Sequence, residues 1–183
     1  MNIQERGQFA LKIARQAIEK WVREKDMLVP AKCPEEFKEK GGVFVTITKN
    51  DNLRGCIGYP EPVKPLIDAL IDAAIQATMD PRFSELGKTE LDEIKIEVSI
   101  LTKPELIESS PEEYIKNIEI GKDGLIAESG YNRGLLLPQV ATEHGMSSEE
   151  FLSQTCMKAG LKADAWKSKD VKMYKFQAQI FHE

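Results

Sequence analysis

The residues whose types and spacing are suited to chemistry lie together in the stretch LRGCIG, residues 53–58. Alternate side chains of a β-strand share a face, so we expect Arg54 and Cys56 to point the same way. A guanidinium beside a thiol favours the thiolate, which is the reactive form of cysteine. Gly55 and Gly58 predict a backbone that a ligand or another chain segment approaches closely.

Two interpretations of Cys56 follow. In the first, it is a catalytic nucleophile in a small pocket, with Arg54 stabilising the thiolate or a bound anion. In the second, it is a small buried residue of a tightly packed hairpin, because free cysteine is among the most buried residue types. His144 is a candidate general base for the first, since histidine titrates near neutrality; the alternative is a surface histidine at a helix end.

Three arginines are candidate anion-binding residues, because a guanidinium binds carboxylate or phosphate bidentately. Arg54, Arg82 and Arg133 each stand near a predicted turn, and their convergence would predict an anionic ligand. Asp80 and Gln139 complete the candidate ligand-binding set. The alternative is structural ion pairing, for example between Arg82 and Asp80.

Composition excludes several classes of function. The chain has 183 residues and a net charge of −5, with acidic and basic residues interleaved, so nucleic-acid binding is not expected. Three cysteines and two histidines fit no zinc pattern, and we expect no metal, although carboxylate ligands stay open. Phosphate-loop and dinucleotide motifs are absent, so no cofactor is expected. With no apolar run long enough for a membrane and no signal-peptide pattern, we expect a cytoplasmic protein.

The surrounding pattern predicts an α+β fold with a largely antiparallel β-sheet flanked by helices and a smaller second subdomain. Hydrophobic periodicity predicts helices over residues 2–26, 64–79, 110–117 and 147–160. Strands are predicted over 43–48, 53–57, 95–101 and 171–181, with further short strands and Gly-rich turns in 118–138. We expect one domain over 1–183, with a small lobe at about 105–140.

Four blocks in order carry a family resemblance: FVTITKNDNLRGCIGYPEP, AIQATMDPRFSEL, ELDEIKIEVSILTKPELI and GLIAESGYNRGLLLPQVATEHGMSSEEFLSQTCMKAGL. In these blocks the chain resembles the AMMECR domain family of the prokaryotic AmmeMemoRadiSam type. The resemblance implies a larger and a smaller subdomain and a functional face around LRGCIG, without an established activity. It also implies Memo-like and radical-SAM-like proteins as partners. The chain has Asp123 where the family often has histidine, so no role for that histidine carries over.

Three hypotheses place function on the same strand. The first is a binding or accessory module that holds a small anionic ligand or a partner protein on the LRGCIG face. The second is a cysteine-dependent enzyme with Cys56 as nucleophile. The third is a nucleic-acid-associated protein, which the acidic charge disfavours. The oligomeric state is not predicted.

Overall fold

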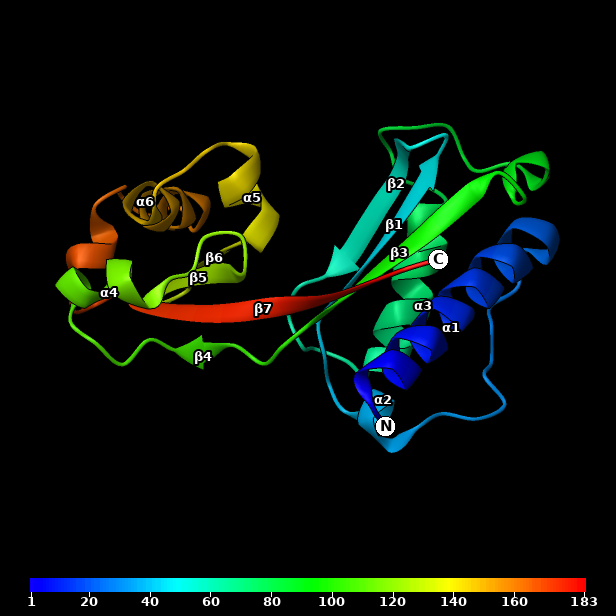
Figure 1. Ribbon diagram of the computed structural model, residues 1–183, viewed down its shortest axis with the longest axis horizontal. Helices are drawn as coiled ribbons and strands as arrows, with labels where there is room; N and C mark the ends of the chain where they lie inside the picture. The colour runs from blue at the N-terminus through cyan, green and yellow to red at the C-terminus, as the bar shows by residue number, and fades with distance from the viewer. The chain divides into compact units, whose positions relative to one another are not determined.

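The computed structural model describes all residues, 1–183, and the chain divides into two compact units. The first unit comprises Met1–Leu101 and Gln179–Glu183, and the second comprises Thr102–Ala178. The last strand, β7 (Lys172–His182), contributes residues to both (Figure 1). Residues 105–140, predicted as a small lobe, fall inside the second unit. None of the helices combines the length and apolar composition that crossing a membrane requires.

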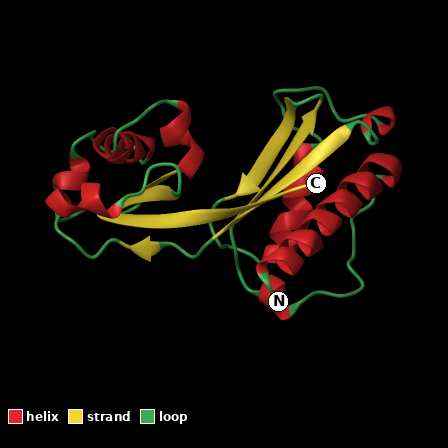
Figure 2. Ribbon diagram, viewed as in Figure 1, coloured by secondary structure: helices red, strands yellow, loops and turns green.

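Antiparallel pairing and separate helices confirm the predicted α+β class (Figure 2). In the first unit the strands run in the order β2–β1–β3, with the end of β7 beside β3. Its regular elements are α1 (Ile3–Glu24), α2 (Glu35–Lys38), β1 (Val43–Lys49), β2 (Asn52–Tyr59), α3 (Leu66–Ala77), the 3-10 helix η1 (Lys88–Glu90) and β3 (Ile94–Leu101).

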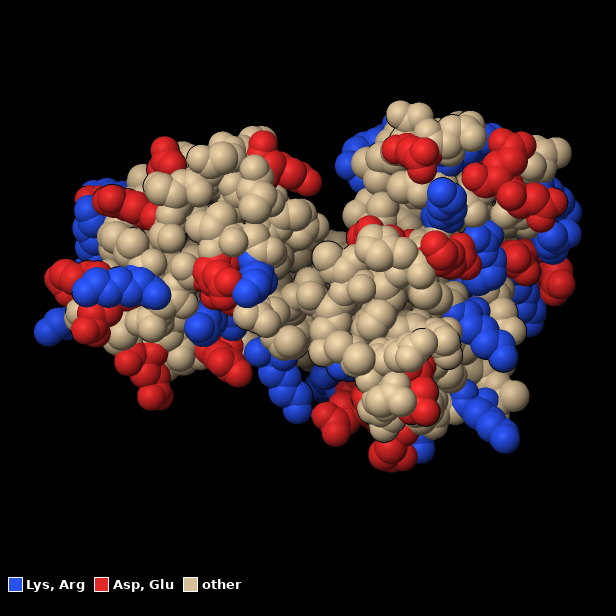
Figure 3. Space-filling view, in the orientation of Figure 1, with Lys and Arg blue, Asp and Glu red and all other residues tan.

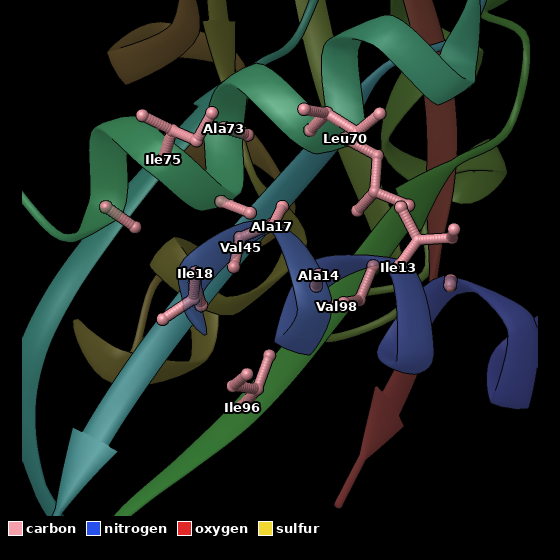
Figure 4. Packing of buried hydrophobic residues seen from close by; sticks show 14 of the residues in the cluster. Ile13, Ala14, Ala17, Ile18, Val45, Leu70, Ala73, Ile75, Ile96 and Val98 are labelled. Atoms are coloured by element: carbon pink, nitrogen blue, oxygen red, sulfur yellow. The ribbon is translucent and has the colours of Figure 1, made fainter. Parts of the chain in front are cut away.

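Helices α1 and α3 pack together on one face of this sheet. Figure 4 shows Ala14 and Ala17 of α1 close to the α3 side chains and above Val45 and Val98 of the strands. Small residues on α1 let this helix approach α3 and the sheet closely, and the strands present β-branched side chains to it. The alternate residues of the same strands lie on the opposite face of the sheet. Cys56 of the candidate site is one of them.

The β1–β2 hairpin departs from simple alternation. Asn50 and Asp51 both have positive φ, 50° and 59°, as a two-residue type I′ turn requires. The register of the strand pair shifts beyond this turn: Thr48 of β1 lies opposite Leu53 of β2, whereas the preceding residue of β1, Ile47, lies opposite Gly55. Arg54 is therefore the extra residue of a β-bulge, so its side chain is re-aimed relative to a regular strand.

The second unit is built on a sheet in the order β4–β7–β5–β6. Its elements besides β7 are β4 (Glu105–Leu106), α4 (Pro111–Asn117), β5 (Asp123–Ser129), β6 (Asn132–Leu136), α5 (Pro138–Glu143), α6 (Ser148–Lys158) and the 3-10 helix η2 (Ala165–Lys167). This unit has its own buried cluster, centred on residues such as Leu125, Phe151, Leu152 and Met173. It therefore has a hydrophobic core separate from the α1–α3 cluster.

Asp123, where the family often has histidine, has a structural position in the second unit. Its carboxylate accepts hydrogen bonds from the Glu119 N–H, at 2.9 Å, and from Gln177 Nε2, at 2.9 Å. The residue is 2% exposed. Asp123 thus closes the turn that leads into β5 and ties it to the neighbouring strand β7.

Candidate functional site

Arg54 fastens the segment that follows α3. Its Nε and Nη2 donate to Glu90 at 3.2 and 2.9 Å, and its Nη1 donates to the Ser84 carbonyl at 2.8 Å. Only 13% of the side chain is exposed. The Arg54 guanidinium is the main reason that the pKa of Glu90 falls to about 2. Arg54 is therefore occupied by loop contacts, and the predicted pairing of its guanidinium with the Cys56 thiol is replaced by these bonds.

The Cys56 thiol instead lies against Thr46, its cross-strand partner. The Thr46 hydroxyl Oγ1 donates a hydrogen bond to Cys56 Sγ at 3.3 Å. Thr46 is also opposite Glu97 of β3, so Cys56, Thr46 and Glu97 form one row across the sheet, on the face away from α1 and α3. Cys56 is half-buried. The Thr46 hydroxyl is therefore the polar group that contacts the Cys56 thiol directly.

The backbone of Cys56 is capped by Asp80 and Arg82. β2 is an edge strand, and its N–H at Cys56 donates to Asp80 Oδ2 at 2.9 Å. The Cys56 carbonyl accepts from Arg82 Nη2 at 3.3 Å. The two side chains thus take the places that a neighbouring strand would fill, and they close the edge of the sheet at Cys56.

Asp80 and Arg82 are also bonded to each other. Asp80 accepts from the Arg82 backbone N–H and from Nε, both at 3.0 Å, and from Nη2 at 2.7 Å. The Arg82 guanidinium is the leading cause of the pKa of Asp80 lying well below its usual range. The Asp80 side chain is 1% exposed, whereas the Arg82 side chain is 56% exposed. Nη1 of Arg82 forms no hydrogen bond, so one edge of the guanidinium is anchored and Nη1 is left unpaired.

The two glycines of LRGCIG accommodate the protein's own chain. A Cβ at Gly55 would stand 2.1 Å from the carbonyl oxygen of Ala77, at the end of α3. A Cβ at Gly58 would stand 2.3 Å from the Phe44 ring. The predicted close approach is present, and the approaching groups are α3 and β1. Of the two possibilities that the sequence left open, the approach of another chain segment is therefore found at both glycines, and ligand binding by Gly55 and Gly58 stays a prediction.

The remaining predicted residues belong to the second unit. Arg133 on β6 forms an ion pair with Glu128 on β5, and its guanidinium lies 5.8 Å from the centre of the Tyr174 ring. Gln139 is exposed on α5, and its carbonyl accepts from the Thr142 hydroxyl at 2.8 Å. Of the predicted set, the first unit brings Cys56, Asp80 and Arg82 into direct contact.

Sequence reasoning missed the polar row beside Cys56. Glu97 accepts from Ser99 Oγ at 3.4 Å, and its other oxygen lies 3.3 Å from His182 Nδ1. The alternation of VFVTITK and IKIEVSIL marks Thr46, Glu97 and Ser99 as sharing the polar face of their strands, but the register that aligns them with Cys56 is not readable from one strand alone. No three His, Cys, Asp or Glu side chains are arranged to hold a metal ion.

Comparison with known proteins places the chain in a family. The profile of the AMMECR1 family matches residues 11–181, so the chain belongs to the AMMECR1 family. It is 58% identical over 180 residues to a protein of Methanothermobacter thermautotrophicus, covering 97% of this chain and 94% of that one. Protein MJ0810 of Methanocaldococcus jannaschii is 51% identical over 183 residues, covering 98% and 90%.

A solved structure confirms the fold. The crystal structure of the uncharacterised protein PH0010 from Pyrococcus horikoshii matches with a TM-score of 0.83 at 48% sequence identity. The match covers 98% of this chain and 92% of the other. The resemblance expected from the four sequence blocks is thereby confirmed.

Proposed function

We propose that this AMMECR1-family chain is a binding or accessory module whose site is the strand 53–58 together with Arg82. The site takes the carboxylate or phosphate of a small ligand or of a partner protein. The observation that carries this proposal is the environment of Arg82: its guanidinium is anchored to buried Asp80 and to the Cys56 carbonyl, yet Nη1 forms no hydrogen bond and the side chain is 56% exposed.

Anchoring makes Arg82 a better hydrogen-bond donor to an anion than an ordinary surface arginine. A guanidinium fixed by three contacts loses little side-chain freedom when an anion binds its open edge. Asp80 neutralises much of the positive charge, however, so the anion gains hydrogen bonds more than long-range attraction. We therefore expect an isolated phosphate to bind with a Kd on the order of millimolar, and a larger ligand to add contacts elsewhere.

Backbone amide NMR with inorganic phosphate tests the proposal. In an ionic-strength-matched titration, saturable shifts are expected at residues 54–58 and 80–83. Arg82→Lys keeps the charge beside Asp80 and removes the open Nη1 edge, so we expect about tenfold weaker binding. Arg23→Lys, at an exposed position on α1, is the matched control and should bind as the wild type does. Shifts that do not saturate, or equal binding by Arg82→Lys, would refute the site.

The family resemblance suggests what a protein ligand would be. Memo-like and radical-SAM-like proteins are the proposed partners, and an acidic side chain or chain terminus of such a partner would bind Arg82. Co-elution of the purified chain with each partner on a sizing column tests this. A complex that forms with wild type and weakens in Arg82→Lys supports the proposal; a complex indifferent to that variant places the partner elsewhere.

The second candidate is a cysteine-dependent enzyme, and the bond from Thr46 to the Cys56 thiol favours it. The histidine of the first unit, His182, contacts Glu97 on β3 and is three strands from β2, so it is not the base for Cys56. Thr46→Val removes the hydroxyl and keeps the shape. An enzyme with Cys56 as nucleophile would show slower alkylation of Cys56 in this variant; an unchanged rate would exclude a role for the hydroxyl.

Charge distribution does not favour nucleic acid. Figure 3 shows that acidic and basic side chains are interspersed over the face of the molecule drawn there. The net charge is −5. Binding through phosphates needs clustered Lys and Arg, and the structure offers single, mostly paired cations such as Arg54 and Arg82.

A further inference from the structure

The second unit contains an apolar pocket outside the LRGCIG strand. It lies against the end of β6, helix α5 and helix α6, and its volume is about 410 Å³. Residues that line it include Leu136, Val140, Met146, Met157, His144 and Lys158. A cavity of this size falls within the range of small-molecule sites, which are mostly apolar with a few polar groups.

Rigid local structure fixes the walls of this pocket. Gly134 of β6 lets the strand approach the end of α6, because a Cβ there would stand 2.2 Å from the Ala159 nitrogen. Gly145, with φ of +60°, ends the α5 segment, and the Met146 N–H then bonds to the Ala141 carbonyl at 2.8 Å. The pocket is therefore bounded by constrained positions, which favours a preformed site.

The rim carries one cation, Lys158, although the whole chain is acidic. Lys158 and His144 are exposed and form no ion pair, and no Asp or Glu lines the pocket. Lys158 is the last residue of α6, but the carbonyls of Cys156 and Met157 already accept the N–H groups of Leu161 and Gly160, both at 2.9 Å. The Lys158 ammonium is thus left without a fixed partner beside an apolar wall.

We propose that this pocket binds a small amphipathic carboxylic acid. Its aliphatic tail packs on Leu136, Val140 and the two methionines, and its carboxylate pairs with Lys158 at the rim. Methionine side chains adapt to tails of different shape. Charge complementarity selects an acid over a neutral molecule of equal length, since the lining offers a cation and no anion.

The experiment compares sodium octanoate with 1-octanol by backbone amide NMR on the full chain, below the micelle concentration of the acid. We expect saturable octanoate shifts confined to residues 134–158 and about two- to fivefold weaker binding of octanol, the effect of a surface charge pair. Lys158→Gln should lower octanoate affinity to that of octanol and leave octanol unchanged. Lys162→Gln, at an exposed lysine outside this lining, is the matched control.

Each outcome decides the proposal. Saturable shifts with acid selectivity that depends on Lys158 alone support it. Absence of saturation, shifts outside these residues, equal affinity for octanol and octanoate, or an equal loss in Lys158→Gln and Lys162→Gln would overturn it. Both lysines are exposed, so neither variant is expected to unfold the chain.

Discussion

Asp80 is the residue whose replacement is most informative, because it holds both the Cys56 backbone and Arg82. Its two oxygens serve different donors: Oδ2 accepts the Cys56 N–H and Oδ1 accepts the Arg82 N–H. An asparagine has one acceptor oxygen, so Asp80→Asn leaves at least one of these N–H groups facing an NH₂. An unsatisfied buried donor costs about 1–3 kcal/mol.

The lost ion pair adds less. The Arg82 side chain is 56% exposed and can be rehydrated, so this contribution is about 0–1 kcal/mol. The two effects together predict that Asp80→Asn lowers the free energy of unfolding by about 1–4 kcal/mol near pH 7. The change should also loosen the edge of β2 at Cys56, where the N–H and carbonyl are both held by this pair.

The effect has a definite pH dependence. The folded state lowers the pKa of Asp80 below that of the unfolded chain, about 3.9, so the carboxylate stabilises the fold above that pH. This stabilisation is lost as the pH falls from about 4 towards the folded pKa. The difference in stability between wild type and Asp80→Asn is therefore full at pH 6–7 and shrinks below about pH 4.

Urea unfolding at pH 7 and at pH 3.5 measures this difference. Asp92→Asn is the matched control, because Asp92 is exposed and holds no backbone group; it should change stability by less than about 0.5 kcal/mol. A loss of under about 1 kcal/mol in Asp80→Asn, or a loss that is as large at pH 3.5 as at pH 7, would refute the role assigned to Asp80.

Further predictions concern packing, capping and thiol access. Gly55→Ala should cost about 3 kcal/mol in unfolding free energy, because the new Cβ meets a helix carbonyl at 2.1 Å; Gly87→Ala, with nothing nearer than 3.9 Å, should cost under about 0.5 kcal/mol. Ser147→Ala should cost about 1 kcal/mol, since it removes the capping box of α6, and unchanged urea unfolding would contradict this. Cys156 is fully buried, and burial raises the pKa of its thiol, so it should resist iodoacetamide until the chain unfolds. Cys33 is only half-buried and should react in the native protein. Mass spectrometry of the labelled peptides distinguishes the two cysteines.

Much of the fold could be predicted because its signals are local. The apolar stripe and the Asn2–Glu5 capping box predict α1, and the structure places the helix at Ile3–Glu24 with that box formed. The predicted strands 43–48 and 53–57 are joined by a type I′ turn at Asn50–Asp51, residue types that favour turns. Helix α2 is not among the predicted helices, because Glu35–Lys38 is one turn long and is held by buried Phe37, a tertiary contact that local sequence does not report.

The site could be predicted only in part, because its geometry depends on non-local contacts. Neighbouring residues predict the Asp80–Arg82 ion pair, and it is present. The bulge at Arg54 could not be predicted, since it depends on how β2 pairs with β1. The bulge re-aims the Arg54 side chain, which forms an ion pair with Glu90. The same non-local register aligns Cys56 with Thr46 and Glu97.

The measurement that most directly tests the central claim is the native alkylation of Cys56 by iodoacetate, an anion, relative to neutral iodoacetamide. Arg82 contacts the Cys56 carbonyl and has an open guanidinium edge, so an anionic reagent should be concentrated beside this thiol. We predict an iodoacetate-to-iodoacetamide rate ratio at Cys56 several-fold higher than at Cys33, falling to the Cys33 value with added phosphate and in Arg82→Lys. Equal ratios at Cys56 and Cys33 in the wild-type protein would contradict an anion site at Arg82.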